Sequence, residues 1–156
     1  MGAAGAGKTT VGTALASALG WPFLDADDLH SPEHVEKMRR GIALTDEDRA
    51  PWLERVHDRI EEMARHGGNA VVACSGLRQT YRDTIAARVP AVRWVLLRAG
   101  ARLLTERLRA RTGHFAGPAL VPSQLAELDP PDDGVIVEAD RPVATLVAEI
   151  RAALNL

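Results

Sequence analysis

Gly2-Ala3-Ala4-Gly5-Ala6-Gly7-Lys8-Thr9 is the stretch around which the rest of the chain is organised. It fits the phosphate-loop pattern G-x-x-x-x-G-K-[ST] at every fixed position. Gly5 and Gly7 allow tight turns, so several main-chain N–H groups can point at one anion. Lys8 adds a mobile positive charge for the outer phosphates, and the Thr9 hydroxyl is placed to bind Mg²⁺. The alternative is a Gly/Ala-rich end that frays, but matches at fixed positions are rarer than such a composition.

A helix is expected directly after this loop, over Thr10–Leu19, with its positive N-terminal end facing the phosphates. A strand normally precedes a phosphate loop, whereas only Met1 stands before this one. Either the true start lies upstream of this sequence, or the protein lacks the strand that carries its loop. We favour the first explanation.

Composition and length exclude several classes of protein. The 156 residues are expected to form one domain, 1–156, with a net charge of −2 and no basic field for nucleic acid. A single cysteine, Cys74, cannot form an internal disulfide, which favours a reducing cytoplasm, and we expect it to be a small buried residue. No apolar run approaches the roughly 18 residues of a membrane helix, and we expect no membrane partner.

Apolar periodicity predicts strands alternating with helices, which is typical of an α/β fold with a central parallel sheet. The expected strands are Trp21–Asp25, Ala70–Ser75, Val92–Leu97 and Val135–Val137. Later helices are expected from Pro32 to Gly41, from Pro51 to His66, over Thr80–Arg88, over Ala101–Arg111 and from Pro142 onward. Thr45–Arg49 is expected to be a charged loop.

Two acidic residues follow the first expected strand, at the edge of the sheet where α/β folds place their sites. We assign Asp25 to the Mg²⁺ shell, and Asp27 to the substrate hydroxyl as a base or orienting group. The alternative is that this acidic segment only caps a turn or helix.

Other polar residues leave two interpretations open. Arg49 is either a surface ion-pair partner or a clamp for a substrate carboxylate. Ser75 either touches substrate or caps the next helix, and Arg82 lies nearby with a solvated helix face as the alternative.

A basic, glycine-punctuated segment around 107–125 is expected to form a helical lid. Arg107, Arg111 and His114 flank its glycines, and an arginine from a closing lid could stabilise the transferring phosphoryl group. The alternative is a basic helix face beside an ordinary surface loop.

Taken together, these stretches resemble the gluconokinases of the small P-loop type, relatives of shikimate kinase and the nucleoside monophosphate kinases. The resemblance covers nearly the whole chain. It rests on Gly2–Thr9, Phe23–His30, Glu36–Met38 with Gly41, Leu44–Leu53, Ala73–Leu77 with Tyr81–Asp83, and Arg111–Phe115 leading to Ser123–Leu125. The phosphate loop alone would identify only a very large superfamily, whereas the other segments together are far more specific.

The resemblance implies ATP-dependent phosphorylation of D-gluconate to 6-phosphogluconate in an enzyme with Mg²⁺ and a closing lid that is commonly a homodimer. It implies an ATP site formed by Gly2, Ala3, Ala4, Gly5, Ala6, Gly7, Lys8, Thr9, Thr10, Arg107 and Arg111. It also implies a substrate site formed by Asp27, His30, Arg49, Ser75 and Arg82, metal binding by Thr9 and Asp25, and catalysis by Lys8, Asp27 and Arg111, with Arg107 in reserve.

One departure from this family matters for the fold. The strand before the phosphate loop lies in the middle of the family's sheet, so its loss would leave a groove in the core. Two alternatives to a gluconate kinase stay open. One is a kinase for another small polyhydroxy acid such as shikimate, because sequence does not enumerate the contacts to the hydroxyls. The other is a shortened nucleotide-binding protein without turnover, because the sequence begins at the phosphate loop.

Overall fold

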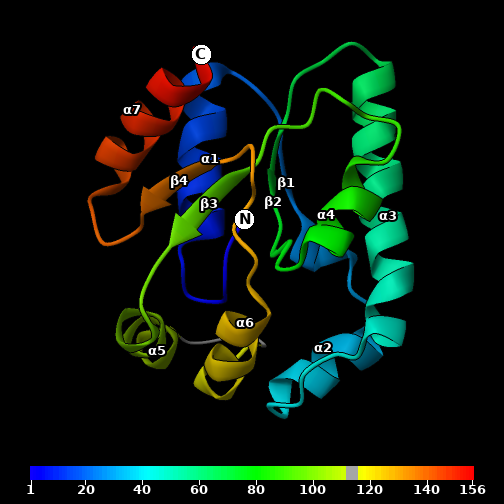
Figure 1. The fold of residues 1–156 in the computed structure, drawn as a ribbon, viewed down its shortest axis with the longest axis vertical. Helices are drawn as coiled ribbons and strands as arrows, with labels where there is room; N and C mark the ends of the chain where they lie inside the picture. The colour runs from blue at the N-terminus through cyan, green and yellow to red at the C-terminus, as the bar shows by residue number, and fades with distance from the viewer. Residues whose placement is uncertain (112–115) are drawn as a thin grey trace.

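The computed structural model describes residues 1–111 and 116–156, and Figure 1 shows α7 and α3 on opposite sides of the molecule with the strands between them. Most of the elements match those expected from the sequence. In chain order they are α1 (Lys8–Leu19), β1 (Phe23–Asp25), the 3-10 helix η1 (Ala26–Leu29), α2 (Pro32–Arg39), α3 (Asp46–Arg65), β2 (Val71–Ala73), α4 (Gln79–Ala86), β3 (Val95–Arg98), α5 (Ala101–Ala110), the 3-10 helix η2 (Pro118–Leu120), α6 (Val121–Glu127), β4 (Val135–Glu138) and α7 (Val143–Leu154).

Helix ends follow local capping chemistry. Gly20 ends α1 in the left-handed conformation, and the Ser31 hydroxyl accepts a hydrogen bond from the His34 N–H at the start of α2. The expectation of a loop over Thr45–Arg49 is wrong, because α3 begins at Asp46. Thr45 and Asp48 form a capping box there, and acidic side chains in the first turn face the positive end of the helix.

Two further differences concern segments that the sequence placed less well. The third strand begins at Val95 rather than Val92. Helix α6 was expected only as part of a lid, and its seven residues are too few to show a clear apolar period.

The strands form two parallel ladders. In the first, β1 pairs with β2 in the register Phe23 to Val71, and in the second β3 pairs with β4 in the register Val95 to Val135. Helices α1 and α7 pack together, and α3 packs with α4.

The first two residues of the chain lie between these ladders. The Met1 amino group donates to the Val95 carbonyl at 2.5 Å, and the Met1 carbonyl accepts from the Leu97 N–H at 2.9 Å. On the other side, the Gly2 N–H donates to the Ser75 carbonyl at 3.1 Å. Met1 and Gly2 therefore occupy a strand position between β2 and β3.

A groove of about 420 Å³ continues from Met1 between the two ladders. Its walls are largely apolar and come from strands and helices on both sides, including Leu15, Ile60, Val72, Val95 and Ile150. Burial lowers the pKa of the Met1 amino group from 8.0 to about 5, because the charged form loses its hydration there.

None of the helices within 1–111 and 116–156 combines the length and the apolar character that crossing a membrane requires.

We expect an engineered apolar strand of ~8 residues placed before Met1 to fill this groove and raise the melting temperature. About 3 kcal/mol of added stability from apolar burial would raise Tm by roughly 10 °C in a domain of this size. Thermal unfolding followed by circular dichroism measures the change.

A Gly-Ser extension of equal length is the control, since it lengthens the chain without apolar side chains. Equal Tm values for both extensions would contradict filling of the groove.

The Met1 amino group makes a separate, pH-dependent contribution to stability. Between pH 5 and 8 the unfolded chain binds more protons at Met1 than the folded chain, so the free energy of unfolding of the unextended protein should rise with pH in this window. Either extension converts the Met1 amine to an amide and should remove this pH dependence.

Candidate active site

The phosphate loop adopts a backbone conformation that requires glycine. Gly2, Gly5 and Gly7 have φ values of 142°, 83° and 95°. A Cβ atom at Gly5 would lie 2.8 Å from the main-chain oxygen of Leu104, so the loop can pack against α5 only without a side chain there. Helix α1 begins at Lys8, and its first N–H groups therefore face the loop.

Two oxygen-bearing side chains meet beside this loop. The Thr9 hydroxyl donates to Asp25 Oδ2 at 2.7 Å, and Asp25 Oδ1 accepts from the Asp27 N–H at 3.1 Å. The described residues contain no cluster of three or more His, Cys, Asp or Glu side chains that could hold a metal alone. A hydroxyl and a carboxylate in contact nevertheless fit Mg²⁺, which is commonly held by few protein ligands together with phosphate oxygens.

A small pocket of about 50 Å³ lies next to the loop. Six of the predicted site residues line it, namely Ala4, Lys8, Asp27, His30, Arg49 and Ser75. The remaining lining comes from Met38, Ala43, Leu44, Trp52, Leu77, Tyr81, Ala116, Leu120, Ser123 and Gln124. The pocket therefore joins the phosphate loop, η1, α3, α4 and α6.

His30 forms an aromatic wall of this pocket. Its ring stacks on Trp52 with centroids 4.5 Å apart and an interplanar angle of 8°. The Trp52 indole N–H donates to the Ala26 carbonyl at 2.7 Å, which fixes the stack against η1. Burial lowers the pKa of His30 to about 4, so the imidazole is neutral at pH 7 and can offer a hydrogen bond without a charge.

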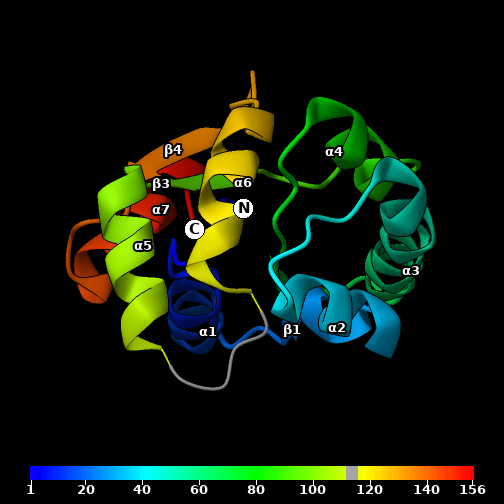
Figure 2. The ribbon, with the colours of Figure 1, turned by 90° about the horizontal axis from the view of Figure 1, so that it is seen from below.

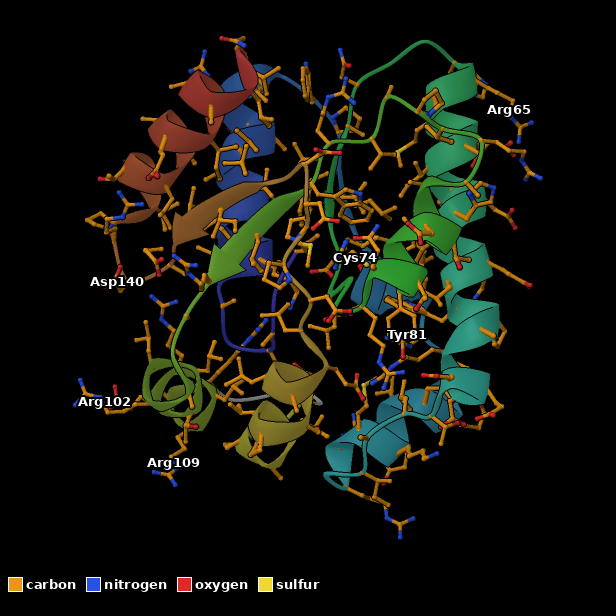
Figure 3. The ribbon with its side chains drawn as sticks, in the orientation of Figure 1. Arg65, Cys74, Tyr81, Arg102, Arg109 and Asp140 are labelled. Carbon is orange, nitrogen blue, oxygen red and sulfur yellow. The ribbon has the colours of Figure 1, made fainter. Side chains whose placement is uncertain are left out.

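Arg49 lies on α3, and its side chain is only 11% exposed. Its Nη1 donates to the Tyr81 hydroxyl at 2.8 Å and lies 3.0 Å from Glu127 Oε2. Its Cζ lies 5.3 Å from the centroid of the Tyr81 ring, and Tyr81 projects from α4 (Figure 3). Arg49 is therefore largely buried on the pocket wall, with an ion-pair partner inside the fold.

Ser75 and Cys74 follow β2 and have different surroundings. Ser75 lines the pocket, while its carbonyl holds the Gly2 N–H. Cys74 is buried in the middle of the molecule (Figure 3), and burial raises the pKa of its thiol to about 12. The thiol is thus unsuited to nucleophilic chemistry, as the sequence predicts.

Arg82, expected at the substrate, is placed outside the pocket. Its side chain is buried, and its guanidinium donates to the carbonyls of Gly76, Leu77 and Asp129 at 2.8, 3.2 and 2.9 Å. It also donates to Gln79 Oε1 at 2.6 Å. These contacts tie the segment after α6 to the start of α4, which is a structural role.

The remaining predicted ATP-site residues, Arg107, Arg111 and Thr10, differ in whether their side chains reach the phosphate loop. Arg107 Nη2 donates to the Ala139 carbonyl at 2.7 Å, and its Nη1 lies 3.4 Å from the Ala6 carbonyl in the phosphate loop. Arg111 is exposed at the end of α5, and Thr10 is exposed on α1. His114 lies outside the described residues. Of the two arginines, the structure thus brings Arg107, the reserve candidate, to the loop.

Sequence reasoning assigned no role to Trp52, Tyr81, Gln124 or Glu127. Trp52 and Tyr81 offered a weak signal, since both lie in segments on which the family resemblance rests and Tyr81 is the one aromatic residue in the polar stretch 79–84. Gln124 lies in a segment on which the family resemblance rests, but that segment assigned it no role, and Glu127 offered no signal, because the significance of both depends on where α6 packs.

Comparisons with known proteins agree on one family. Residues 4–127 match the family described as shikimate kinase. The chain is 44% identical over 149 residues to a gluconokinase of Gluconobacter oxydans, covering 96% of this chain and 80% of that protein.

Solved structures give the same result. A sugar kinase from Janibacter superposes with a TM-score of 0.92 at 37% identity, covering 99% of this chain and 91% of that one. A gluconokinase from Sinorhizobium meliloti superposes with a TM-score of 0.87 at 40% identity, covering 99% of this chain and 89% of that one.

The structural role of Arg82 predicts that Arg82→Met destabilises the fold. The substitution would leave several buried carbonyls without their donor, and we expect a loss of about 3 kcal/mol in the free energy of unfolding. Urea denaturation measures it. Arg93→Met is the matched control, because Arg93 also donates to carbonyls, of Pro90 and Val92, but is exposed. Equal stability of the two variants would contradict this role.

Proposed function

The chain belongs to the shikimate kinase family, with gluconokinases among its relatives, and we propose that it transfers the γ-phosphoryl group of ATP to the 6-hydroxyl of D-gluconate. The observation that carries this proposal is a single pocket lined at once by Lys8 and Ala4 of the phosphate loop, by Asp27 and by Arg49. Such a pocket offers groups for a phosphate, for a hydroxyl and for a carboxylate.

The nucleotide end is formed by the phosphate loop. Main-chain N–H groups from the loop and the first turn of α1 would bind the phosphates, and Lys8 would neutralise their outer charge. Lys8 Nζ lies 3.3 Å from the Ala3 carbonyl, so it already folds back over the loop. Arg107 lies near the Ala6 carbonyl and is the nearer of the two candidate arginines for stabilising negative charge at the phosphates.

Thr9 and Asp25 would hold Mg²⁺, directly or through water. The ion would supply charge neutralisation between the phosphates. Their mutual hydrogen bond of 2.7 Å places the hydroxyl and the carboxylate oxygen on one side of the loop before any ligand arrives.

Asp27 is the group that we assign to the reacting hydroxyl. It is the second residue of η1, which directly follows β1, and it lines the pocket together with Lys8. A carboxylate there can accept the hydrogen of a sugar hydroxyl and orient its oxygen toward the phosphate, which is the main requirement of phosphoryl transfer.

Arg49 is the group that we assign to the gluconate carboxylate, with His30 and Ser75 as neutral partners for the hydroxyls between the two ends. A planar guanidinium binds a carboxylate through two parallel hydrogen bonds. The neutral state of His30 suits contacts with uncharged hydroxyls. We propose that the enzyme works in the cytoplasm, because its single cysteine, which is free, suits a reducing compartment.

The test is a coupled assay of ADP formation by the purified protein. We expect turnover only when ATP, Mg²⁺ and D-gluconate are all present. Turnover of shikimate in place of gluconate would overturn the substrate assignment. ATP binding without turnover of either acid would indicate a nucleotide-binding protein that is not an active kinase.

Asp27→Asn is the matched variant for the chemical step, because it keeps the size of the side chain and removes its charge. We expect turnover to fall by roughly 10²–10⁴-fold with little change in Tm. Lys8→Ala should also reduce turnover by orders of magnitude. A normal rate in Asp27→Asn would contradict the hydroxyl-orienting role.

Arg49→Ala tests the acid end separately. We expect the KM for gluconate to rise by about 10²-fold, corresponding to ~3 kcal/mol for a charged hydrogen-bonded pair, while the KM for ATP changes little. Steady-state kinetics with each substrate varied in turn separates the two. Equal effects on both constants would argue against carboxylate recognition by Arg49.

A further inference from the structure

Helix α6 joins the two ends of the pocket. Seen from below in Figure 2, it lies between α5 on one side and α2, α3 and α4 on the other. Gln124 and Glu127 are three residues apart on this helix and therefore share one of its faces. Gln124 contacts the phosphate loop, and Glu127 contacts Arg49.

Gln124 anchors α6 to the phosphate loop. Its side-chain oxygen accepts a hydrogen bond from the Ala4 N–H at 2.7 Å. Ala4 is buried and Gln124 is half-buried, so solvent competes only weakly for this bond. The position of α6 is thus set relative to the loop that receives the phosphates.

Glu127 connects α6 to Arg49, the residue proposed to bind the gluconate carboxylate. Its Oε2 lies 3.0 Å from Arg49 Nη1, and its Oε1 lies 3.4 Å from Arg78 Nη2. The Tyr81 ring contacts both guanidiniums, at 5.3 Å from the Cζ of Arg49 and 5.5 Å from that of Arg78. Asp46 accepts hydrogen bonds from the Tyr81 hydroxyl and from Arg78 at 2.5 and 3.1 Å.

We propose that Glu127 is a positioning residue for Arg49, and that α6, anchored through Gln124, sets the orientation of the acid-binding arginine from the phosphate loop. This inference rests on the proposed function, in which Arg49 receives the gluconate carboxylate. Among the described residues that line the pocket, Arg49 and Gln124 are present and Glu127 is not, so Glu127 acts through Arg49.

The geometry of Arg49 explains why a partner behind it matters. Its contacts with Tyr81 and Glu127 both run through Nη1. The opposite edge of the planar fork can then face a carboxylate in the pocket. Both side chains of the pair are largely buried, at 11% and 18% exposure, so water screens their attraction little. Without Glu127 the fork would lose one of the contacts that hold its plane, and small misplacements of binding groups are costly.

Glu127→Gln tests the proposal, since it keeps the shape of the side chain and removes its charge. We expect the KM for gluconate to rise about 5–10-fold, with the KM for ATP unchanged within twofold and kcat changed less than KM. Glu106→Gln is the matched control, because Glu106 forms an exposed pair with Arg102 at 3.8 Å on α5. The control should leave both Michaelis constants unchanged.

A double-mutant cycle identifies the route of the effect. If Glu127 acts through Arg49, Glu127→Gln should change the KM for gluconate no further in an Arg49→Ala background. Additive effects would overturn the proposal. A lower KM for gluconate in Glu127→Gln alone would also overturn it, because Glu127 would then compete with the substrate for Arg49.

Gln124→Leu provides a second variant that leaves the charge pair intact. Loss of its bond to Ala4 should free α6 and raise the KM for gluconate, and an unchanged value would contradict the anchoring role. Failure of the proposed function can be told apart from failure of this inference, because it would appear as absent gluconate turnover in the unmodified protein. If the unmodified protein turns over gluconate and Glu127→Gln leaves both Michaelis constants unchanged, only the inference about Glu127 is overturned.

Discussion

Three main-chain hydrogen bonds at Met1 and Gly2 hold the two halves of this molecule in register. They run from the Met1 amine to Val95, from Leu97 to the Met1 carbonyl, and from Gly2 to Ser75. Each ladder is only two strands wide, and a pair of strands is marginally stable alone. The start of the phosphate loop therefore also links the parallel ladders, and the geometry of the site depends on it.

This constraint explains why chemically distinct groups share one small pocket. The phosphate loop leaves the strand position between the ladders, while Asp25 ends β1 and Ser75 follows β2. The carboxyl ends of parallel strands meet at one edge of a sheet, so the Asp25 carboxylate at the end of β1 reaches the loop. The Thr9–Asp25 bond is the direct contact between these two parts of the site.

The acid end depends on a different kind of contact. Glu127 of α6 pairs with Arg49 of α3 and with Arg78, which directly precedes α4. Both guanidiniums lie beside the ring of Tyr81 on α4. Buried charges are tolerated only when each has a partner, so the network orders side chains that would otherwise be mobile. The proposed binding of an acid at Arg49 would thus be linked to the packing of α6 by electrostatics, whereas the proposed nucleotide site would rely on main-chain N–H groups.

The sequence by itself determined the phosphate loop, the alternation of strands and helices, and the helix limits at Leu19 and Pro32, because these depend on local backbone preferences and short-range hydrogen bonds. It also indicated that Asp27, His30, Arg49 and Ser75 belong together, and the structure places all four around one pocket. Only the tertiary structure decided the partners of the arginines. Arg82 proved to hold buried carbonyls, Arg107 to reach the loop, and Arg49 to pair with Glu127. Long charged side chains can reach many neighbours, and which one they meet depends on how helices distant in the sequence pack together.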